Sequence, residues 1–311
     1  MQIKPNSIMK EPNKEWFINA PWGKIAMISW GNPDGEPVLL VHGRSDSVAT
    51  FIPLLELLPD NYHYVGADLP GNGKSDPFPV GVTLCRIHFL GALEVIVNHL
   101  KWDQFTYIGH SNGCDQGLFY NVIYPGRVKK FILLDGSMAM QRLQIHNMSE
   151  YFDAFYAEYY DNYKKYNVDD RVYTKKRAID AVIRARGLDV EKAEIALSRS
   201  LKCISDDQYK LSWDRRLRFP APQNYSPDYY YQLFSRNSPP TLHIQCTLSQ
   251  GYLPGKAHVE KLLSDLSKNM QHFVLVTVEG DHDVHLTNPD RIIGYIKDFL
   301  NRDFKKEKCK L

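Results

Sequence analysis

The chain has 311 residues, a length that suits one large α/β domain or one domain with a big insertion. Its 38 basic and 36 acidic residues give a net charge of +2, so we expect no nucleic acid partner. The five widely spaced cysteines form no CxxC or Cys/His pattern, so the sequence supports neither a disulfide framework nor a zinc site and favours a reducing, intracellular compartment.

The first part of the chain alternates predicted strands and helices. Residues 24–31 alternate weakly and end at the turn cluster NPDGEP, which predicts a strand of an antiparallel pair. Residues 37–43 (PVLLVHG) are a continuous apolar run that stops at a glycine, as in buried parallel strands. Residues 64–68 predict the next strand, and apolar residues at helical spacing predict a helix over about residues 84–100.

The alternation continues to residue 135 and resumes near residue 240. Residues 105–111 and 129–135 predict strands on either side of a helix over residues 114–125. After residue 240 the predicted order is strand, helix, strand, helix, at residues 241–248, 256–269, 271–280 and 288–304. Strands that alternate with helices imply βαβ units and a mainly parallel sheet.

Residues 136–239 break this alternation. No clear strand is visible there, whereas residues 149–166, 174–187 and 189–201 have helical patterns. A segment of roughly a hundred residues is too long for a simple loop. We therefore predict an α/β fold, a mainly parallel sheet flanked by helices. Residues 1–135 and 240–311 form the core domain in this prediction, and residues 136–239 form an inserted helical cap.

Residues 109–113 (GHSNG) lie between a predicted strand and a predicted helix. Gly-x-Ser-x-Gly in this context is typical of a strained turn that presents a nucleophilic serine, here Ser111, between two small neighbours. The N-terminal N–H groups of the following helix favour negative charge at such a site. The alternative is a glycine-rich turn with a capping serine, because so short a pattern has frequent false positives.

A serine nucleophile needs a base, and the end of the chain offers two histidines. His282 follows a predicted strand and Gly280, and its place after Ser111 matches the chain order serine, acid, histidine. His285 is the competitor, with packing at the start of the last helix as its other role. We predict His282 as the base.

An oxyanion hole needs two N–H donors. We expect one at the backbone of Asn112, directly after the nucleophile. We expect the other at Arg44, in the tight loop that follows His42-Gly43. No metal and no cofactor is expected, because this chemistry needs only water.

Together these motifs resemble the α/β-hydrolase superfamily. VHGRSDSVATF is similar to its oxyanion segment, DLPGNGKSD to its stretch after the next strand, GHSNG to its nucleophile turn and GDHDVHLTNPDRI to its histidine loop. Within the superfamily the chain most resembles the serine-hydrolase-like (SERHL/kraken) group, through FILLDGS, YKLSWDRRLRF, QGYL and DHDVHLTNPDRI. The resemblance covers most of the chain outside the cap and implies the α/β-hydrolase fold.

The chain departs from the family at the acid of the triad. The common position follows the strand after the cap, but IQCTLSQGYLPG contains neither Asp nor Glu. Some members place the acid after the strand that follows the nucleophile turn, which implies Asp135 as the residue that orients His282. Asp135 as a cap of Gly136-Ser137 is the alternative. Without an acid, Ser111 and His282 would work as a slower dyad.

A serine at this turn suits acyl transfer, whereas related epoxide hydrolases and haloalkane dehalogenases use an aspartate there. We therefore expect a carboxylesterase or thioesterase that acts on a small apolar ester or thioester through an acyl-serine intermediate. The alternative is a ligand-binding receptor or carrier with little or no turnover. The acid missing from its usual position and the polar Asn112 keep this alternative open.

The predicted cap is rich in aromatic residues. On a helix, Phe152, Phe155, Tyr156, Tyr159 and Tyr163 would form one broad face. This face either packs the cap onto the core or lines an apolar pocket. The basic residues of TKKRAIDAVIRARG and DRRLRF are interpreted as a solvated face rather than a phosphate site. An acyl-CoA substrate remains an alternative.

The chain ends in Cys309-Lys310-Leu311, which resembles the S-K-L peroxisomal address with Cys in place of Ser. This predicts a peroxisomal location and an import receptor as partner. The alternative is a frayed basic tail on a cytoplasmic protein. Neither a secretory signal nor an integral membrane segment is expected, because no apolar run has the required pattern or length.

Overall fold

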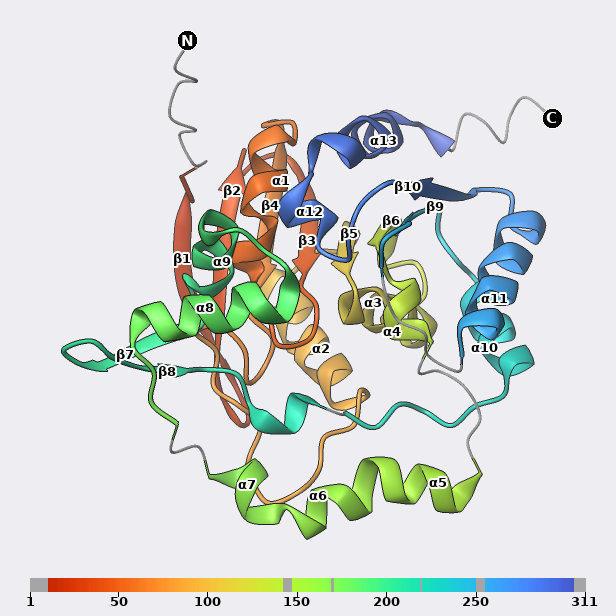
Figure 1. The fold of residues 1–311 in the computed structure, drawn as a ribbon. Coiled ribbons are helices and arrows are strands. Elements are labelled where there is room, and N and C mark those ends of the chain that lie inside the picture. Colours follow the sequence, from red (N-terminus) through yellow and green to blue (C-terminus); the bar gives the residue numbers. More distant parts are fainter. Residues whose placement is uncertain (1–10, 142–146, 169–170, 219, 250–254, 305–311) are drawn as a thin grey trace.

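The computed structural model describes residues 11–141, 147–168, 171–218, 220–249 and 255–304. Its centre is an eight-stranded sheet in the order β1-β2-β4-β3-β5-β6-β9-β10 (Figure 1). The strands are β1 (Lys14–Ala20), β2 (Gly23–Gly31), β3 (Glu36–Val41), β4 (Tyr62–Ala67), β5 (Phe105–His110), β6 (Val128–Leu134), β9 (Thr241–Cys246) and β10 (Phe273–Val278). β2 pairs antiparallel with β1 and β4, and the remaining neighbours are parallel, which confirms the predicted mainly parallel sheet.

The central strands are buried along almost their whole length. Every residue of β5 is buried, and in β6 only Lys129 is exposed. Strands covered on both faces carry mainly apolar side chains, without the alternation of a half-exposed strand. The run VLLV of β3 has this pattern, whereas β5 and β6 also bury polar residues such as Thr106, His110 and Lys130.

Helices cover both faces of the sheet, with two separate apolar clusters beneath them. One cluster includes side chains of α2 (His88–Leu100), α3 (Asn112–Ile123) and α11 (Lys256–Asn269). The other includes side chains of α1 (Ile52–Leu57), α12 (Val284–Thr287) and α13 (Asp290–Asn301). Along β3, Leu39 and Val41 belong to the first cluster and Val38 and Leu40 to the second, because successive strand residues point to opposite faces.

Between β6 and β9 the chain adds helices and one hairpin, and its described residues add no strand to the large sheet. The helices are α4 (Ser137–Met140), α5 (Met148–Phe152), α6 (Glu158–Asp161), α7 (Tyr163–Asn167), α8 (Lys175–Arg186), α9 (Val190–Leu197) and α10 (Pro227–Ser235), with a π-helical turn, Asp153–Ala157, between α5 and α6. The hairpin is β7 (Leu201–Ser205) and β8 (Gln208–Leu211). We call residues 136–239 the inserted segment.

The hairpin corrects the expectation that the inserted segment holds no clear strand. Four of the five residues of β7 are exposed, and β8 is only partly buried. A strand with little burial has no reason to show an apolar pattern, so the sequence carried no signal for it. Its turn contains Asp207 at φ 50°, without the glycine that usually marks such turns.

The helix predicted over residues 84–100 begins later, at His88. The backbone of Leu84 and Arg86 pairs instead with Ala221 of the inserted segment, through bonds of 2.8 Å and 3.0 Å. This long-range pairing replaces the first helical turn.

None of the helices in the described ranges has both the length and the apolar character that crossing a bilayer requires. Cys309, Lys310 and Leu311 lie outside the described residues, so the peroxisomal address stays a prediction.

Candidate active site

Ser111 sits at the junction of β5 and α3 with φ 51° and ψ −117°, a strained conformation for a residue with a side chain. A Cβ atom at Gly113 would lie 2.3 Å from the carbonyl oxygen of Val41, and one at Gly109 would lie 2.8 Å from that of Gly113. Both positions therefore require glycine. The Ser111 amide donates to the carbonyl of Leu134 over 2.9 Å, which ties the turn to the next strand.

The structure brings Ser111, His282 and Asp135 into one hydrogen-bonded chain. Nε2 of His282 lies 2.9 Å from Oγ of Ser111, and Nδ1 lies 2.6 Å from Oδ2 of Asp135. Each of the three follows a strand of the large sheet: Ser111 follows β5, Asp135 follows β6 and His282 follows β10. The carboxyl ends of parallel strands lie at one edge of the sheet, which explains why residues so far apart in sequence meet.

Asp135 is fully buried, and other groups at the carboxyl end of β9 hold it in place. The Cys246 amide donates to its Oδ1 over 2.9 Å, and the Ser249 hydroxyl donates to its Oδ2. These bonds and the contact with His282 occupy the carboxylate, so it does not cap the Gly136-Ser137 turn. The segment after β9, which lacks an acid of its own, instead contributes hydrogen-bond donors to Asp135.

The charges of the pair reinforce each other. Burial raises the pKa of Asp135, but bonds from His282, Ser249 and Cys246 outweigh it and leave the pKa below its usual value. Burial lowers the pKa of His282, but the hydrogen bond and charge of Asp135 outweigh it and leave the pKa above its usual value. The lowered pKa keeps Asp135 ionised, and the raised pKa shows that its charge favours the protonated form of His282.

The two expected oxyanion donors, Arg44 and Asn112, line the same cavity as Ser111. His42 orders the loop before Arg44. Its Nε2 accepts from the Leu69 amide over 2.9 Å, which leaves Nδ1 to donate to the carbonyl of Gly43 over 2.6 Å. A Cβ atom at Gly43 would lie 3.1 Å from the Cβ of Ser111, so a side chain at this position would fit only if the serine turn shifted by a few tenths of an ångström.

The cavity in front of Ser111 has a volume of about 1110 Å³. The ends of the strands and the loops after them form its floor, including Gly43, Ser111 and His282. The inserted segment contributes Tyr173, Ala181, Val182, Ala185, Arg186, Leu211 and Trp213. Chemically active groups and a largely apolar wall therefore come from different parts of the chain.

Comparison with known proteins identifies the family to which the chain belongs. The model for the alpha/beta hydrolase fold matches residues 36–289. The chain belongs to the α/β-hydrolase family. The predicted resemblance to this family and its serine-hydrolase-like group is thus confirmed.

Two relatives align with this hydrolase over most of their length. The serine hydrolase-like protein of Danio rerio is 28% identical, covering 94% of this chain and 90% of its own. Serine hydrolase-like protein 2 of Homo sapiens is 27% identical, and the alignment covers 92% of this chain and 93% of that protein. The solved thioesterase domain from the curacin biosynthetic pathway is similar in fold, with a TM-score of 0.73 and 19% identity over 91% of this chain and 98% of that domain.

The second histidine of the loop, His285, is fully buried on α12 and takes no part in the chain from Ser111 to Asp135. Its ring lies 4.0 Å from that of His110 and 5.1 Å from that of Phe51, measured between centroids. Burial lowers the pKa of His285 to about 3, so the ring is neutral at ordinary pH. The hydrolase therefore uses His285 to pack the loop, as the alternative interpretation had it.

Side-chain atoms of Asp46, His110 and His285 that could bind a metal ion lie within 4.8 Å of one another. The positive charge beside Asp46 is instead that of Arg186, whose guanidinium donates to Oδ1 and Oδ2 of Asp46 over 3.4 Å and 3.3 Å. A metal ion beside this guanidinium would be repelled, so the cluster is better explained as a buried ion-pair site.

The aromatic residues of α5–α7 do not contribute to the described lining of the cavity. Phe155 and Tyr159 are buried, whereas Phe152 and Tyr163 are about half exposed. In Figure 1, α5–α7 form a row at the far side of the inserted segment, and α8 lies nearer the ends of the strands. Of the two alternatives for this face, pocket lining is wrong for this cavity.

The solvated-face interpretation of the basic residues is wrong for two of them. Arg216 is fully buried, where it pairs with Asp214 and donates to the carbonyls of Phe78, Pro79 and Val82. Arg186 pairs with Asp46 and Asp283 and lines the cavity. The sequence did not predict the ion pairs of Arg186, the hydrogen bond from Ser249 to Asp135, or the hydrogen bonds by which His42 orders its loop. No local pattern distinguishes a buried arginine or serine from an exposed one.

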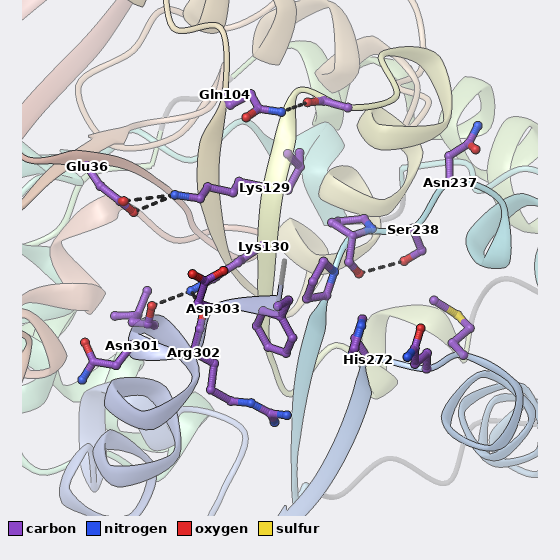
Figure 2. A pocket seen from close by; sticks show the side chains of 18 of the residues that line it. Glu36, Gln104, Lys129, Lys130, Asn237, Ser238, His272, Asn301, Arg302 and Asp303 are labelled. Atoms are coloured by element: carbon purple, nitrogen blue, oxygen red, sulfur yellow. Dashed lines mark hydrogen bonds and ion pairs between the residues drawn. The ribbon is translucent and has the colours of Figure 1, made fainter. Parts of the chain in front are cut away.

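A second cavity, of about 920 Å³, lies at the opposite end of the strands (Figure 2). Its lining includes Lys129, Lys130, Pro239, His272 and Phe304, and none of the residues of the Ser111 site. The ammonium of Lys130 donates to the last carbonyls of α13 and to that of Arg302, so it stabilises a helix end.

Proposed function

We propose that this hydrolase cleaves a carboxylic ester or thioester through an acyl-serine intermediate. The observation that carries the proposal is the unbroken hydrogen-bonded chain from Ser111 through His282 to Asp135 at the floor of a large cavity. The family membership and the names of the relatives are consistent with it.

In the first step, Oγ of Ser111 attacks the carbonyl carbon of the substrate and transfers its proton to Nε2 of His282. The negative charge that develops on the carbonyl oxygen is stabilised by the backbone N–H groups of Arg44 and Asn112. The tetrahedral intermediate collapses as the bond to the leaving oxygen or sulfur breaks. His282 returns the proton to that atom, and the alcohol or thiol departs.

In the second step, a water molecule attacks the acyl-serine. His282 takes one proton from the water, and the oxygen of the water bonds to the acyl carbon. When the second tetrahedral intermediate collapses, the bond to Oγ breaks and His282 protonates Ser111. The products are a carboxylic acid and the regenerated serine, with no oxidant or metal consumed.

The substrate group held by the cavity is apolar in this proposal. Val182, Leu211 and Trp213 supply apolar surface opposite the sheet. Burial of a hydrocarbon chain against such a wall is worth about 0.8 kcal/mol for each CH₂ group. We further propose that residues 136–239 act as the cap, which sets the length and shape of the group accepted.

The test is labelling with a fluorophosphonate, read by intact mass. We expect one adduct on the wild type, its loss in Ser111→Ala, and slow formation in His282→Ala and Asp135→Asn. Ser198→Ala, which removes an exposed serine hydroxyl of the inserted segment, is the matched control and should label like the wild type.

Turnover then separates an enzyme from a binding protein. Sustained release of p-nitrophenol from short p-nitrophenyl esters, absent in Ser111→Ala, supports the proposal. A single stoichiometric burst, or a wild type that forms no adduct, would favour the receptor or carrier alternative instead.

A further inference from the structure

Arg186 is the last residue of α8 and the one charged side chain of that helix in the described lining of the Ser111 cavity. It makes a two-pronged contact with Asp283: Nε donates to Oδ2 over 2.9 Å and Nη2 donates to Oδ1 over 2.6 Å. It also reaches Asp46 with both terminal nitrogens, over 3.3 Å and 3.4 Å. Only 19% of its side chain is exposed, against 8% for Asp283 and 3% for Asp46.

The two acids belong to the two loops that the chemistry needs. Asp283 directly follows His282, and Asp46 is two residues beyond Arg44, the expected oxyanion donor. Arg186 comes from the inserted segment and is far from both in sequence. A planar guanidinium that engages two carboxylates fixes their relative positions, because its donors have a rigid geometry.

We propose that Arg186 is a positioning residue, which holds the histidine loop and the oxyanion loop in register and balances the negative charge beside His282. The proposal rests on the function proposed above. It makes the docking of α8 a condition for an assembled site, so the inserted segment takes part in the reaction as well as in substrate choice.

The balance of charge around His282 gives the proposal a specific signature. The groups that face the ring or its loop from neighbouring elements are Ser111, Asp135, His110, His285, Asp46, Asp281, Asp283 and Arg186. Burial lowers the pKa of His282, Asp135 raises it most, Asp283 raises it further, and Arg186 lowers it. His110 and His285 have depressed pKa values because they are buried, so they stay neutral.

Removal of Arg186 takes away a charge that lowers the pKa of His282 and leaves Asp283 without its counter-ion. The pKa of His282 then rises. Only the neutral imidazole accepts the proton of Ser111, so the acidic limb of the reaction rate moves to higher pH. Replacement of Asp283 by Asn removes a charge that raises the pKa, so the limb moves to lower pH.

The experiment measures the rate of fluorophosphonate labelling between pH 5 and 9 for the wild type, Arg186→Gln, Arg186→Lys, Asp283→Asn and the double variant Arg186→Gln/Asp283→Asn. For Arg186→Gln we expect a plateau rate about 10- to 100-fold lower, as for displaced catalytic groups, and a limb moved to higher pH. Arg186→Lys keeps the charge but not the fork, so its limb stays in place while its plateau falls. The double variant should restore the limb toward the wild-type position.

Arg184→Gln is the matched control, because Arg184 is an exposed arginine on the same helix. It should behave like the wild type. Circular dichroism checks the fold of each variant, and if Arg186→Gln does not fold, the opposite shift in Asp283→Asn still tests the charge balance.

Two results would overturn the inference. Plateau rates that fall with no movement of the limb in any variant would make Arg186 a purely structural residue. Unchanged labelling in Arg186→Gln by this neutral probe would show that Arg186 does not position the site. A wild type that does not label at all would instead contradict the proposed function, so the two failures are distinguishable.

Discussion

The edge of the sheet and the inserted segment build the same cavity by different means. The edge places Ser111 and Asp135 directly after buried strands, where backbone bonds to neighbouring strands fix them, and it places His282 in the loop after β10. The inserted segment supplies the opposite wall from α8 and the hairpin region, through side chains such as Val182 and Trp213. Reactive groups need precise placement, which a sheet provides, whereas an apolar wall tolerates variation.

A second contrast lies inside the inserted segment. The row α5–α7 holds 8 of the 17 aromatic residues of the segment, yet the cavity is lined by α8 and by the chain around the end of β8. Aromatic content therefore indicates that a helix buries surface, but not which surface. The path of the chain decides which helix faces Ser111.

The largest expected effect concerns the edge of the sheet. Asp135→Asn keeps the shape of the side chain but removes the charge that holds the tautomer of His282. We expect kcat for a p-nitrophenyl ester to fall about 10⁴-fold, as in serine enzymes whose triad acid is so replaced.

Ser249→Ala is the companion variant, since Ser249 also donates to Asp135 but leaves its charge intact. Its loss should be much smaller. An Asp135→Asn protein within about tenfold of the wild type would mean that Ser111 and His282 act as a dyad.

The next effect concerns the attachment of the inserted segment to the core. Arg199 donates from Nε to Asp68 over 2.9 Å, with side chains only 7% and 0% exposed. Arg199→Ala leaves the buried carboxylate without its charged partner, which should lower the free energy of unfolding by about 3 to 5 kcal/mol. Urea denaturation measures this. Lys176→Ala, which breaks the exposed pair with Asp180, should change it by less than about 0.5 kcal/mol.

A smaller effect is expected at the wall of the cavity. The indole of Trp213 donates to Ser200 over 3.1 Å and lines the space before Ser111. Trp213→Ala should raise KM for long-chain esters about tenfold and leave short acetyl esters almost unchanged, because only the long chain reaches the wall. Equal losses for both chain lengths would mean that Trp213 supports the catalytic loops rather than the substrate.

The smallest effect separates the two aromatic regions. Phe152 is 50% exposed and stacks on Tyr156, with centroids 5.9 Å apart. Phe152→Ala should leave kcat/KM for every ester within about twofold of the wild type, since surface changes of this kind rarely matter. A shift in chain-length preference as large as that of Trp213→Ala would return α5–α7 to the substrate site.

Much of the fold follows from local patterns. Apolar runs mark β3 (VLLV) and the second half of β6 (FILL), because strands buried on both faces carry mainly apolar side chains. The turn around Ser111 can likewise be predicted from the sequence, since its close contacts require glycines at fixed spacing. Helix starts are harder to predict, as in α2, where backbone pairing with Ala221 replaces the predicted first turn.

Local patterns thus predict the order of strands and helices around the large sheet, the turn at Ser111 and the histidine loop, since each depends on neighbours along the chain, but they miss the β7–β8 hairpin. The packed fold is needed to show that Ser249 donates to Asp135, that Arg186 joins two loops, and that α8 rather than α5–α7 faces the serine. Those facts depend on contacts between residues far apart in sequence. A buried arginine and a solvated one have the same local pattern, and only the packed fold distinguishes them.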